Sequence, residues 1–401
     1  MRRLFAYRDA RLLVGGQTLS AFGDFAMWIV MAVWMKNLTG SSSRAGLVFF
    51  VLSLGALTAP LGGLLADRVR RRPLMIATDL LLGSAVLLLL LVHDAGDAWL
   101  IYLVAFLYGV GASVFFPARS ALLRLMLPEE LLAEANGILS STQQGIRIIA
   151  PLVGAGLYAA FGGGVVAILD AATFAGSALF LSRMRVAEET PRPEERHFVT
   201  DVTAGFRHVW RTLPLRQLVG GVSVALLVVG FSETLIFFVI ARVGKQPSFF
   251  GVMATLQGIG AIAGGLTAAY LVRRAGDLKA AGIGLALFGV CALLLTLPEL
   301  PIVLLAFPVA GVGLAWVIVG YNTAMQTRTP LAIQGRVSSA GDLVATLAQT
   351  TSIATGAALA VVVDYRVLLV VMAAVLAASG LYLGTRREPA IPAEVFPLGV
   401  D

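Results

Sequence analysis

Three ionisable side chains lie inside long apolar stretches of the sequence. Asp24 and Arg147 each fall near the middle of such a stretch, and Glu233 lies within another. A charge held in hydrocarbon costs about 3 kcal/mol or more, so a residue of this kind needs a partner charge, a proton or a function. The sequence therefore predicts a proton-coupling set of Asp24, Glu233 and Arg147. Because their depths match, Asp24 and Arg147 are expected to face one another or to share a cavity through water.

Three further acids interrupt the apolar pattern. Asp170 lies within an apolar stretch, whereas Asp79 and Asp342 are expected within a turn or two of the end of theirs, where arginines are available as partners. We therefore expect structural or gating roles for Asp79, Asp170 and Asp342 rather than transfer of the coupling ion.

These residues belong to a chain that is too apolar for a soluble protein. Of the 401 residues, 58% are hydrophobic and 13% are charged, against about a quarter charged in soluble domains. The run 80–92 is continuously apolar, which excludes the alternating pattern of a membrane β-barrel. A spanning helix needs about 20 residues, so we expect an all-α membrane protein with twelve transmembrane helices. The predicted spans are 11–36, 45–66, 74–93, 98–123, 135–160, 163–183, 216–241, 249–272, 279–297, 301–325, 337–361 and 365–384.

The basic residues lie mainly on one side of the predicted membrane. Most of the 30 Lys and Arg residues fall before the first span or in the segments 68–72, 183–216, 273–279 and 386–387. Cytoplasmic loops carry such an excess, so both termini are expected in the cytoplasm and the protein in the cell (inner) membrane. The formal charge of +7 then reflects membrane orientation, and no nucleic-acid partner is expected.

The two halves of the sequence resemble each other. Residues 120–141 resemble residues 322–341, with Pro128 matching Pro330. Two parallel halves with a substrate site between them are one architecture of secondary transporters. We expect six-helix bundles at 1–183 and 216–386, a cytoplasmic connector with an amphipathic helix at 184–215, and a cytoplasmic tail at 387–401.

The loop after the second predicted span carries a recognisable motif, because residues 63–72 read GLLADRVRRR. This stretch resembles the GxLaDrxGrk signature of the major facilitator superfamily. The stretches 115–137 and 161–181 further resemble the bacterial drug and siderophore exporters of that superfamily, including its macrolide-efflux group. The resemblance implies a twelve-helix fold and a cytoplasmic gate at the motif. The gate residues would be Gly63, Asp67, Arg68, Arg71 and Arg72.

Two other stretches are similar to superfamily motifs. Residues 145–156 resemble the antiporter motif of the fifth helix, where small residues let helices pack closely. In the fourth predicted span, Ala105 stands where the superfamily motif places an arginine. The helix-packing residues implied here are Gly145, Pro151, Gly154 and Gly156.

The resemblance also implies a substrate cavity surrounded by helices 1, 4, 7 and 10. The polar and aromatic residues on these helices and their neighbours favour a large apolar or amphipathic substrate over a sugar, which would need many more hydrogen-bonding groups. The predicted cavity residues are Gln17, Trp28, Phe106, Tyr108, Gln143, Phe231, Gln257, Trp316, Tyr321 and Asn322.

The leading functional hypothesis is proton-coupled efflux of hydrophobic or amphipathic small molecules by alternating access. Import or flipping of a lipid-like or siderophore-like substrate is a second reading, and a non-transporting membrane receptor is a third. No enzyme is expected, because the three histidines lie at span ends or in the connector and no HExxH or GxSxG motif is present. No metal or cofactor is expected. The expected partners are the bilayer, protons and the substrate, with the protein a monomer.

Overall fold

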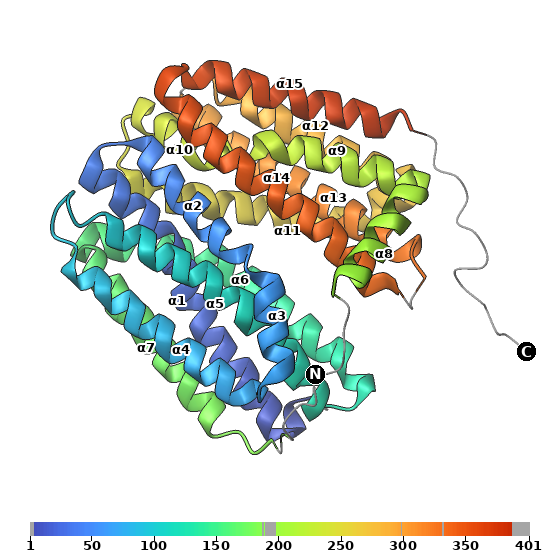
Figure 1. The fold of residues 1–401 in the computed structure, drawn as a ribbon. Helices are drawn as coiled ribbons and strands as arrows, with labels where there is room; N and C mark the ends of the chain where they lie inside the picture. The colour runs from blue at the N-terminus through green and yellow to red at the C-terminus, as the bar shows by residue number, and fades with distance from the viewer. Residues whose placement is uncertain (1–3, 187, 189–197, 298, 331–332, 387–401) are drawn as a thin grey trace, which may run out of the picture. The chain divides into compact units, whose positions relative to one another are not determined.

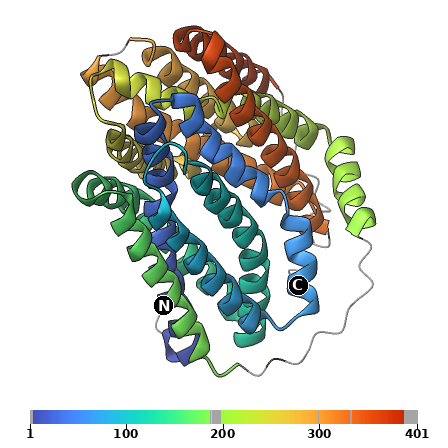
Figure 2. The same cartoon turned by 60° about the vertical axis from the view of Figure 1, so that its left-hand side comes forward.

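The computed structural model describes residues 4–186, 188, 198–297, 299–330 and 333–386, and every regular element in this part of the chain is helical. The chain divides into two compact units (Figures 1 and 2). The first comprises residues 1–194 and 244–255, and the second comprises residues 195–243 and 256–401.

The first unit is a bundle of apolar helices. Its longest helices are α1 and α6, and α1 runs beside both α6 and α7, while α4 packs against α5 and α7 (Figure 1). Its core at one end includes Leu13, Met75, Leu122 and Leu181, each at most 1% exposed. The elements are η1 (Leu4–Ala6), α1 (Arg8–Thr39), α2 (Ser42–Ala56), α3 (Ala59–Arg68), α4 (Arg71–Leu87), η2 (Leu88–Leu91), α5 (Trp99–Met126), α6 (Glu129–Phe161), α7 (Gly163–Ser182) and η3 (Pro247–Phe249).

The second unit is a bundle preceded by one amphipathic helix. This helix, α8 (Phe198–Arg211), places Val209 in the interior and leaves Trp210 exposed. The helices that follow are α9 (Leu213–Val229), α10 (Ser232–Arg242), α11 (Phe250–Ala275), which begins in the first unit, α12 (Asp277–Leu294), α13 (Leu300–Thr327), α14 (Gln334–Val362) and α15 (Tyr365–Gly384).

The helices coincide with the predicted spans, but two spans are broken. Residues 45–66 form two short helices, α2 and α3, separated at Leu57 and Thr58. Residues 216–241 form α9 and α10, which meet at an angle of 41°. In the described chain, ten helices are long and apolar enough to cross a membrane, and the α9–α10 pair gives an eleventh if it is one span. The predicted count of twelve and the cytoplasmic position of the termini therefore stay predictions.

Equivalent glycines mark the same helix crossing in each unit. A Cβ on Gly109 of α5 would lie 2.0 Å from the carbonyl oxygen of Leu52 in α2, and one on Gly311 of α13 would lie 1.9 Å from that of Gln257 in α11. Backbones approach this closely only where a side chain is missing. Gly109 and Gly311 are separated by the same number of residues as the sequence match of Pro128 with Pro330. The packing is therefore repeated along with the sequence.

Candidate functional site

Three carboxylates gather in the interior of the first unit. They are Asp24 on α1, Asp79 on α4 and Asp170 on α7, and Asp24 interacts electrostatically with both of the others. Asp170 is fully buried and Asp79 is 1% exposed, whereas Asp24 is half-buried. We call these three residues the acid cluster. Figure 2 shows α7 beside α1 in this unit.

Asp170 is the member of the acid cluster with the most hydrogen bonds. The Tyr108 hydroxyl, on α5, donates to Oδ2 of Asp170. The Thr173 hydroxyl lies 3.3 Å from Oδ1 of Asp170 and 2.8 Å from its backbone oxygen. A carboxyl that accepts hydrogen bonds of this kind is stabilised in its ionised form.

Gly23 brings α1 close enough for this arrangement. A Cβ at Gly23 would lie 2.2 Å from Oδ1 of Asp170 and 2.2 Å from Oγ1 of Thr173. No side chain fits there, so the Asp170 carboxyl lies directly against the backbone of α1. Asp24, the next residue, has the Ser20 hydroxyl 3.4 Å from its Oδ2.

Asp79 lies in a different polar setting. Its carboxyl lies beside the hydroxyl of Ser177 on α7. Asp79 Oδ2 and Ser177 Oγ are both buried and lack hydrogen-bond partners in the described structure. Asp79 was expected near a helix end with an arginine partner. It lies eight residues after the start of α4, about two turns or 12 Å along the helix, which is the expected depth, and its recorded polar neighbour is Ser177 rather than an arginine.

The predicted ion pair of Asp24 with Arg147 is absent between these two described residues. Arg147 is exposed on α6, and the recorded partner of Asp24 is Ser20. The contact of Gly154 with Ala26 explains why. At 1.5 Å per residue, Arg147 lies about 10 Å from this contact along α6, whereas Asp24 lies about 3 Å from it along α1. The two side chains are therefore at different levels.

Glu233 lies at a helix start rather than in mid-helix. It is in the first turn of α10, directly after the break between α9 and α10, and its side chain is half-buried. The sequence predicted one continuous span here, so the position of the break was not foreseen. An acid in the first turn of a helix interacts favourably with the exposed N–H groups and the helix dipole.

The predicted cavity residues of the first unit are partly engaged in packing. Gln17 is buried, and its Oε1 accepts a hydrogen bond from Arg119 Nη1 at 3.3 Å. Trp28 packs edge to face on Phe49, with ring centroids 5.2 Å apart. Tyr108 belongs to the surroundings of the acid cluster. The remaining two, Phe106 and Gln143, are half-buried.

The predicted cavity residues of the second unit also differ in their contacts and exposure. Trp316 donates its Nε1–H to the Gly264 oxygen at 3.1 Å and approaches Thr267 Oγ1 at 3.0 Å. Tyr321 has a buried hydroxyl without a hydrogen-bond partner. The other three differ in exposure: Phe231 is buried, Gln257 is half-buried and Asn322 is exposed. Asp342, a predicted structural acid, is also exposed.

The predicted gate motif is held by a residue that the sequence did not single out. Glu188 accepts the backbone N–H of Arg71 at 2.6 Å and that of Arg72 at 2.9 Å, at the start of α4. The Arg72 side chain in turn donates to the backbone oxygens of Leu181, at 2.8 Å, and Ser182, at the end of α7. Both contacts satisfy helix-end groups that otherwise lack partners. Of the other motif residues, Gly63 contacts nothing across its open side, Arg68 is exposed, and the Asp67 side chain lies outside the described residues.

The predicted helix-packing residues divide into two groups. A Cβ on Gly154 would lie 2.8 Å from the backbone of Ala26, so α6 and α1 approach closely there. Pro151 is buried within α6. Gly145 and Gly156 face open space.

We expect Gly154→Val to destabilise the protein by about 1 to 3 kcal/mol, because overpacking forces two helix backbones apart. Gly156→Val is the matched control, since it adds the same side chain on the same helix where nothing lies within 4 Å. Thermal unfolding of the detergent-purified proteins measures the difference. Equal unfolding temperatures for the two variants would contradict the close approach of α6 to α1.

The second unit contains a buried ion pair that our sequence analysis did not predict. Arg328, just after α13, binds Asp277, the first residue of α12, through Nη2 to Oδ1 at 2.9 Å and Nε to Oδ2 at 3.1 Å. Both side chains are 6% exposed. The Arg328 backbone oxygen also lies 3.3 Å from Nε2 of His208, which connects α8 to this end of the bundle. A signal existed in the sequence, because Asp277 and Arg328 both follow apolar spans on the same predicted side of the membrane.

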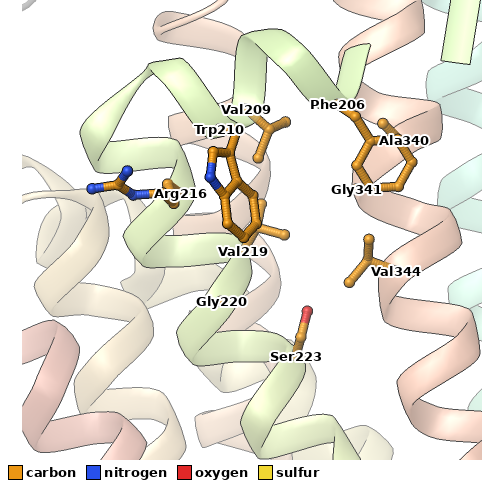
Figure 3. A pocket seen from close by; sticks show the side chains of 10 residues that line it. All are labelled: Phe206, Val209, Trp210, Arg216, Val219, Gly220, Ser223, Ala340, Gly341 and Val344. Atoms are coloured by element: carbon orange, nitrogen blue, oxygen red, sulfur yellow. The ribbon is translucent and has the colours of Figure 1, made fainter. Parts of the chain in front are cut away.

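An apolar pocket of about 290 Å³ lies between α8, α9 and α14 (Figure 3). The Trp210 ring and the Val219 side chain border it, with the Arg216 guanidinium directed away from its centre. Its lining is mostly apolar, which suits an apolar group rather than a polar ligand. The lining residues are Phe206, Val209, Trp210, Arg216, Val219, Gly220, Ser223, Ala340, Gly341 and Val344.

No group of three or more His, Cys, Asp or Glu side chains in the described residues is arranged to hold a metal ion. The polar groups of the acid cluster are carboxyls, hydroxyls and a phenol, all of which can bind protons.

Comparison with known proteins identifies the family. The family model described as Major Facilitator Superfamily matches residues 13–245 and 222–396. The multidrug efflux pump Tap of Mycolicibacterium fortuitum is 29% identical over 82% of this chain and 84% of its own. Macrolide efflux protein A of Streptococcus pyogenes is 30% identical over 36% of each chain. The lysophospholipid transporter LplT of Cronobacter sakazakii is 26% identical over 80% of this chain and 81% of its own.

The fold also matches solved transporters. A bacterial homologue of the iron transporter ferroportin, in its inward-facing state, superposes with a TM-score of 0.74 at 16% identity, over 94% of this chain and 99% of that one. With the family match over nearly the whole sequence, this likeness accounts for the repeated helix packing and the many apolar helices. The chain belongs to the Major Facilitator Superfamily of membrane transporters, is not an enzyme, and resembles the efflux pumps of that family.

Proposed function

We propose that the protein exports hydrophobic or amphipathic small molecules in exchange for protons. The observation that carries this proposal is the acid cluster, which places three carboxyls inside one helical unit. Carboxyls at membrane depth are costly and mark proton or ion pathways. The relatives whose names describe multidrug and macrolide efflux support the direction and the substrate class.

In this scheme Asp24 exchanges protons with the substrate pathway. It is the half-buried member of the acid cluster, and it lies on the same helix as the predicted cavity residues Gln17 and Trp28. Glu233 is proposed as the corresponding acid of the second unit, whereas Arg147, which is exposed on α6 and does not pair with Asp24, is given no part in the scheme. The protein is proposed to act as a monomer in the cell membrane, with both termini in the cytoplasm.

Purified protein in proteoliposomes tests the proposal. Erythromycin and a fluorescent lipophilic dye serve as probes, and a pH gradient is applied in either direction. We expect probe movement against its gradient that is driven by proton flow in the opposite direction and stops when a protonophore is added. Transport that ignores the pH gradient, or no transport of either probe, would contradict the proposal.

A lipid-like substrate is the second candidate, because one relative is named as a lysophospholipid transporter. A fluorescent lysophospholipid in the same proteoliposomes distinguishes it. Movement of this lipid between leaflets, without movement of the other two probes, would favour the second candidate.

A further inference from the structure

We propose that the pocket between α8, α9 and α14 binds the segment 394–401 of this same chain. Phe396 and Leu398 would be seated in the pocket, with Glu394 beside Arg216. The segment reads EVFPLGVD and lies outside the described residues. This contact is separate from the proposed transport chemistry, because it gives the end of the chain a binding site on the second unit.

The pocket calls for an apolar occupant. The rings of Phe206 and Trp210 approach it from α8, and the Val344 side chain borders it from α14 (Figure 3). On α9, nothing lies within 4 Å of the position that a Cβ on Gly220 would take, so this side of the pocket is open. Water finds few hydrogen-bond partners in a space with such a lining. An apolar side chain would gain most there, since it would leave water.

The mouth of the pocket is basic. Arg216 is exposed, and its guanidinium is directed away from the pocket centre (Figure 3). Arg207 and Arg211 are also exposed, on α8 just before it. No described acid forms an ion pair with any of these three arginines. A ligand that carries a carboxylate next to apolar side chains is therefore complementary to the pocket in both respects.

The described chain ends close to the pocket. α15 ends at Gly384, and its Leu383 packs on α9, because a Cβ on Gly221 would lie 3.0 Å from Cδ2 of Leu383. Gly221 directly follows Gly220 of the pocket lining. The end of α15 and the pocket are thus at the same level of α9, on neighbouring faces of that helix.

The remaining chain is long enough to reach the pocket. Ten residues separate Arg386, the last described residue, from Phe396. Fully extended, they span up to about 33 Å, whereas a helix with its side chains is about 10 to 12 Å wide. A path around α9 therefore lies well within reach.

The sequence of this segment matches the pocket. Glu394 and Asp401 flank the apolar residues Val395, Phe396 and Leu398. Proline fixes φ, and proline-containing segments dock into aromatic-lined grooves at a low entropic cost. The tether also makes binding intramolecular, with an effective concentration on the order of mM, so a weak contact is sufficient. Three prolines precede or interrupt the apolar residues, namely Pro389, Pro392 and Pro397.

The reactivity of a thiol in the pocket tests the proposal in the full chain. Cys291→Ser removes the single cysteine, and Ser223→Cys then places one in the pocket lining. We expect a water-soluble maleimide to react about tenfold faster when Phe396→Ala and Leu398→Ala are added, a factor that corresponds to about 1.4 kcal/mol. Ile391→Ala is the matched control, because it shortens an apolar side chain of the tail outside the proposed segment, and it should leave the rate unchanged.

A disulfide cross-link gives a second measurement in the Cys291→Ser background. Under mild oxidation by copper phenanthroline, Ser223→Cys with Gly399→Cys should form a bond that mass spectrometry locates. Val362→Cys with Gly399→Cys is the control pair and should not. Val362 is exposed on α14, but it lies 18 residues beyond Val344 of the pocket, about 27 Å along the helix.

Each remaining outcome would overturn the proposal. One is an equal alkylation rate with the wild-type and the doubly substituted tail, and another is equal cross-linking of the two cysteine pairs. A rate that ignores the tail substitutions and falls only when phosphatidylglycerol is added would assign the pocket to a lipid instead. None of these measurements requires transport, so the result stands whether or not the proposed efflux is found.

Discussion

Asp24→Asn is expected to reduce proton-driven efflux to the level of protein-free vesicles. The substitution keeps the size of the side chain but removes the carboxyl that we propose exchanges protons. Movement of the probe down its own concentration gradient should continue, because that process does not require a titratable group. Uphill and downhill fluxes in the same proteoliposomes measure the two effects separately.

The control for this experiment is Glu299→Gln, an equivalent loss of one carboxyl at an exposed position before α13. It should transport at the wild-type rate with an unchanged pH profile. If Asp24→Asn also keeps the wild-type uphill rate and pH profile, Asp24 is not the coupling residue, whatever the state of the other two acids.

The second large effect is expected at the buried ion pair of the second unit. Arg328→Met should destabilise the protein by about 3 to 5 kcal/mol, because it leaves the carboxylate of Asp277 buried without its partner. The double variant Arg328→Met with Asp277→Asn should recover much of this loss, since no charge is then left uncompensated. Chemical or thermal unfolding of the wild type, both single variants and the double variant gives the coupling energy.

This double-mutant cycle isolates the pair only if the single substitutions do not create new contacts. Lys279→Met is a suitable control, because Lys279 is an exposed cation in the same first turn of α12. It should change stability by less than about 1 kcal/mol, the range of exposed ion pairs. Additive effects of Arg328→Met and Asp277→Asn would mean that the contact contributes nothing of its own to stability.

The positions of the helices were largely predictable from the sequence, since long apolar runs define where a chain can cross a bilayer. The breaks within two of them were not. Between α9 and α10 the apolar pattern runs on without interruption, and only Gly230 hints at the change of direction. The broken span moved Glu233 from the expected helix interior to a helix start.

The grouping of the three acids in the acid cluster could not be predicted from the sequence. Each acid could be placed approximately in depth, and for Asp24 this was enough to propose a proton-handling role. The rotation of each helix about its axis and the choice of neighbouring helices depend on tertiary packing, however. Asp79 and Asp170 were therefore expected to have structural or gating roles, and Arg147 was paired with Asp24 on depth alone. The contact of Gly23 with Asp170 is one of the close approaches of α1 to α7, and nothing in the pattern of either helix reveals it.

The bend between α9 and α10 determines how a tilt of α10 affects the rest of the second unit. A Cβ on Gly230 would lie 2.6 Å from the backbone nitrogen of Ile353, and one on Gly356 would lie 2.8 Å from Cα of Phe231. The bend between α9 and α10 therefore packs closely against α14. A tightly packed contact of this kind is stiff, so a force that tilts α10 is transmitted to α14 instead of being absorbed at the bend. We therefore expect α9, α10 and α14 to move together.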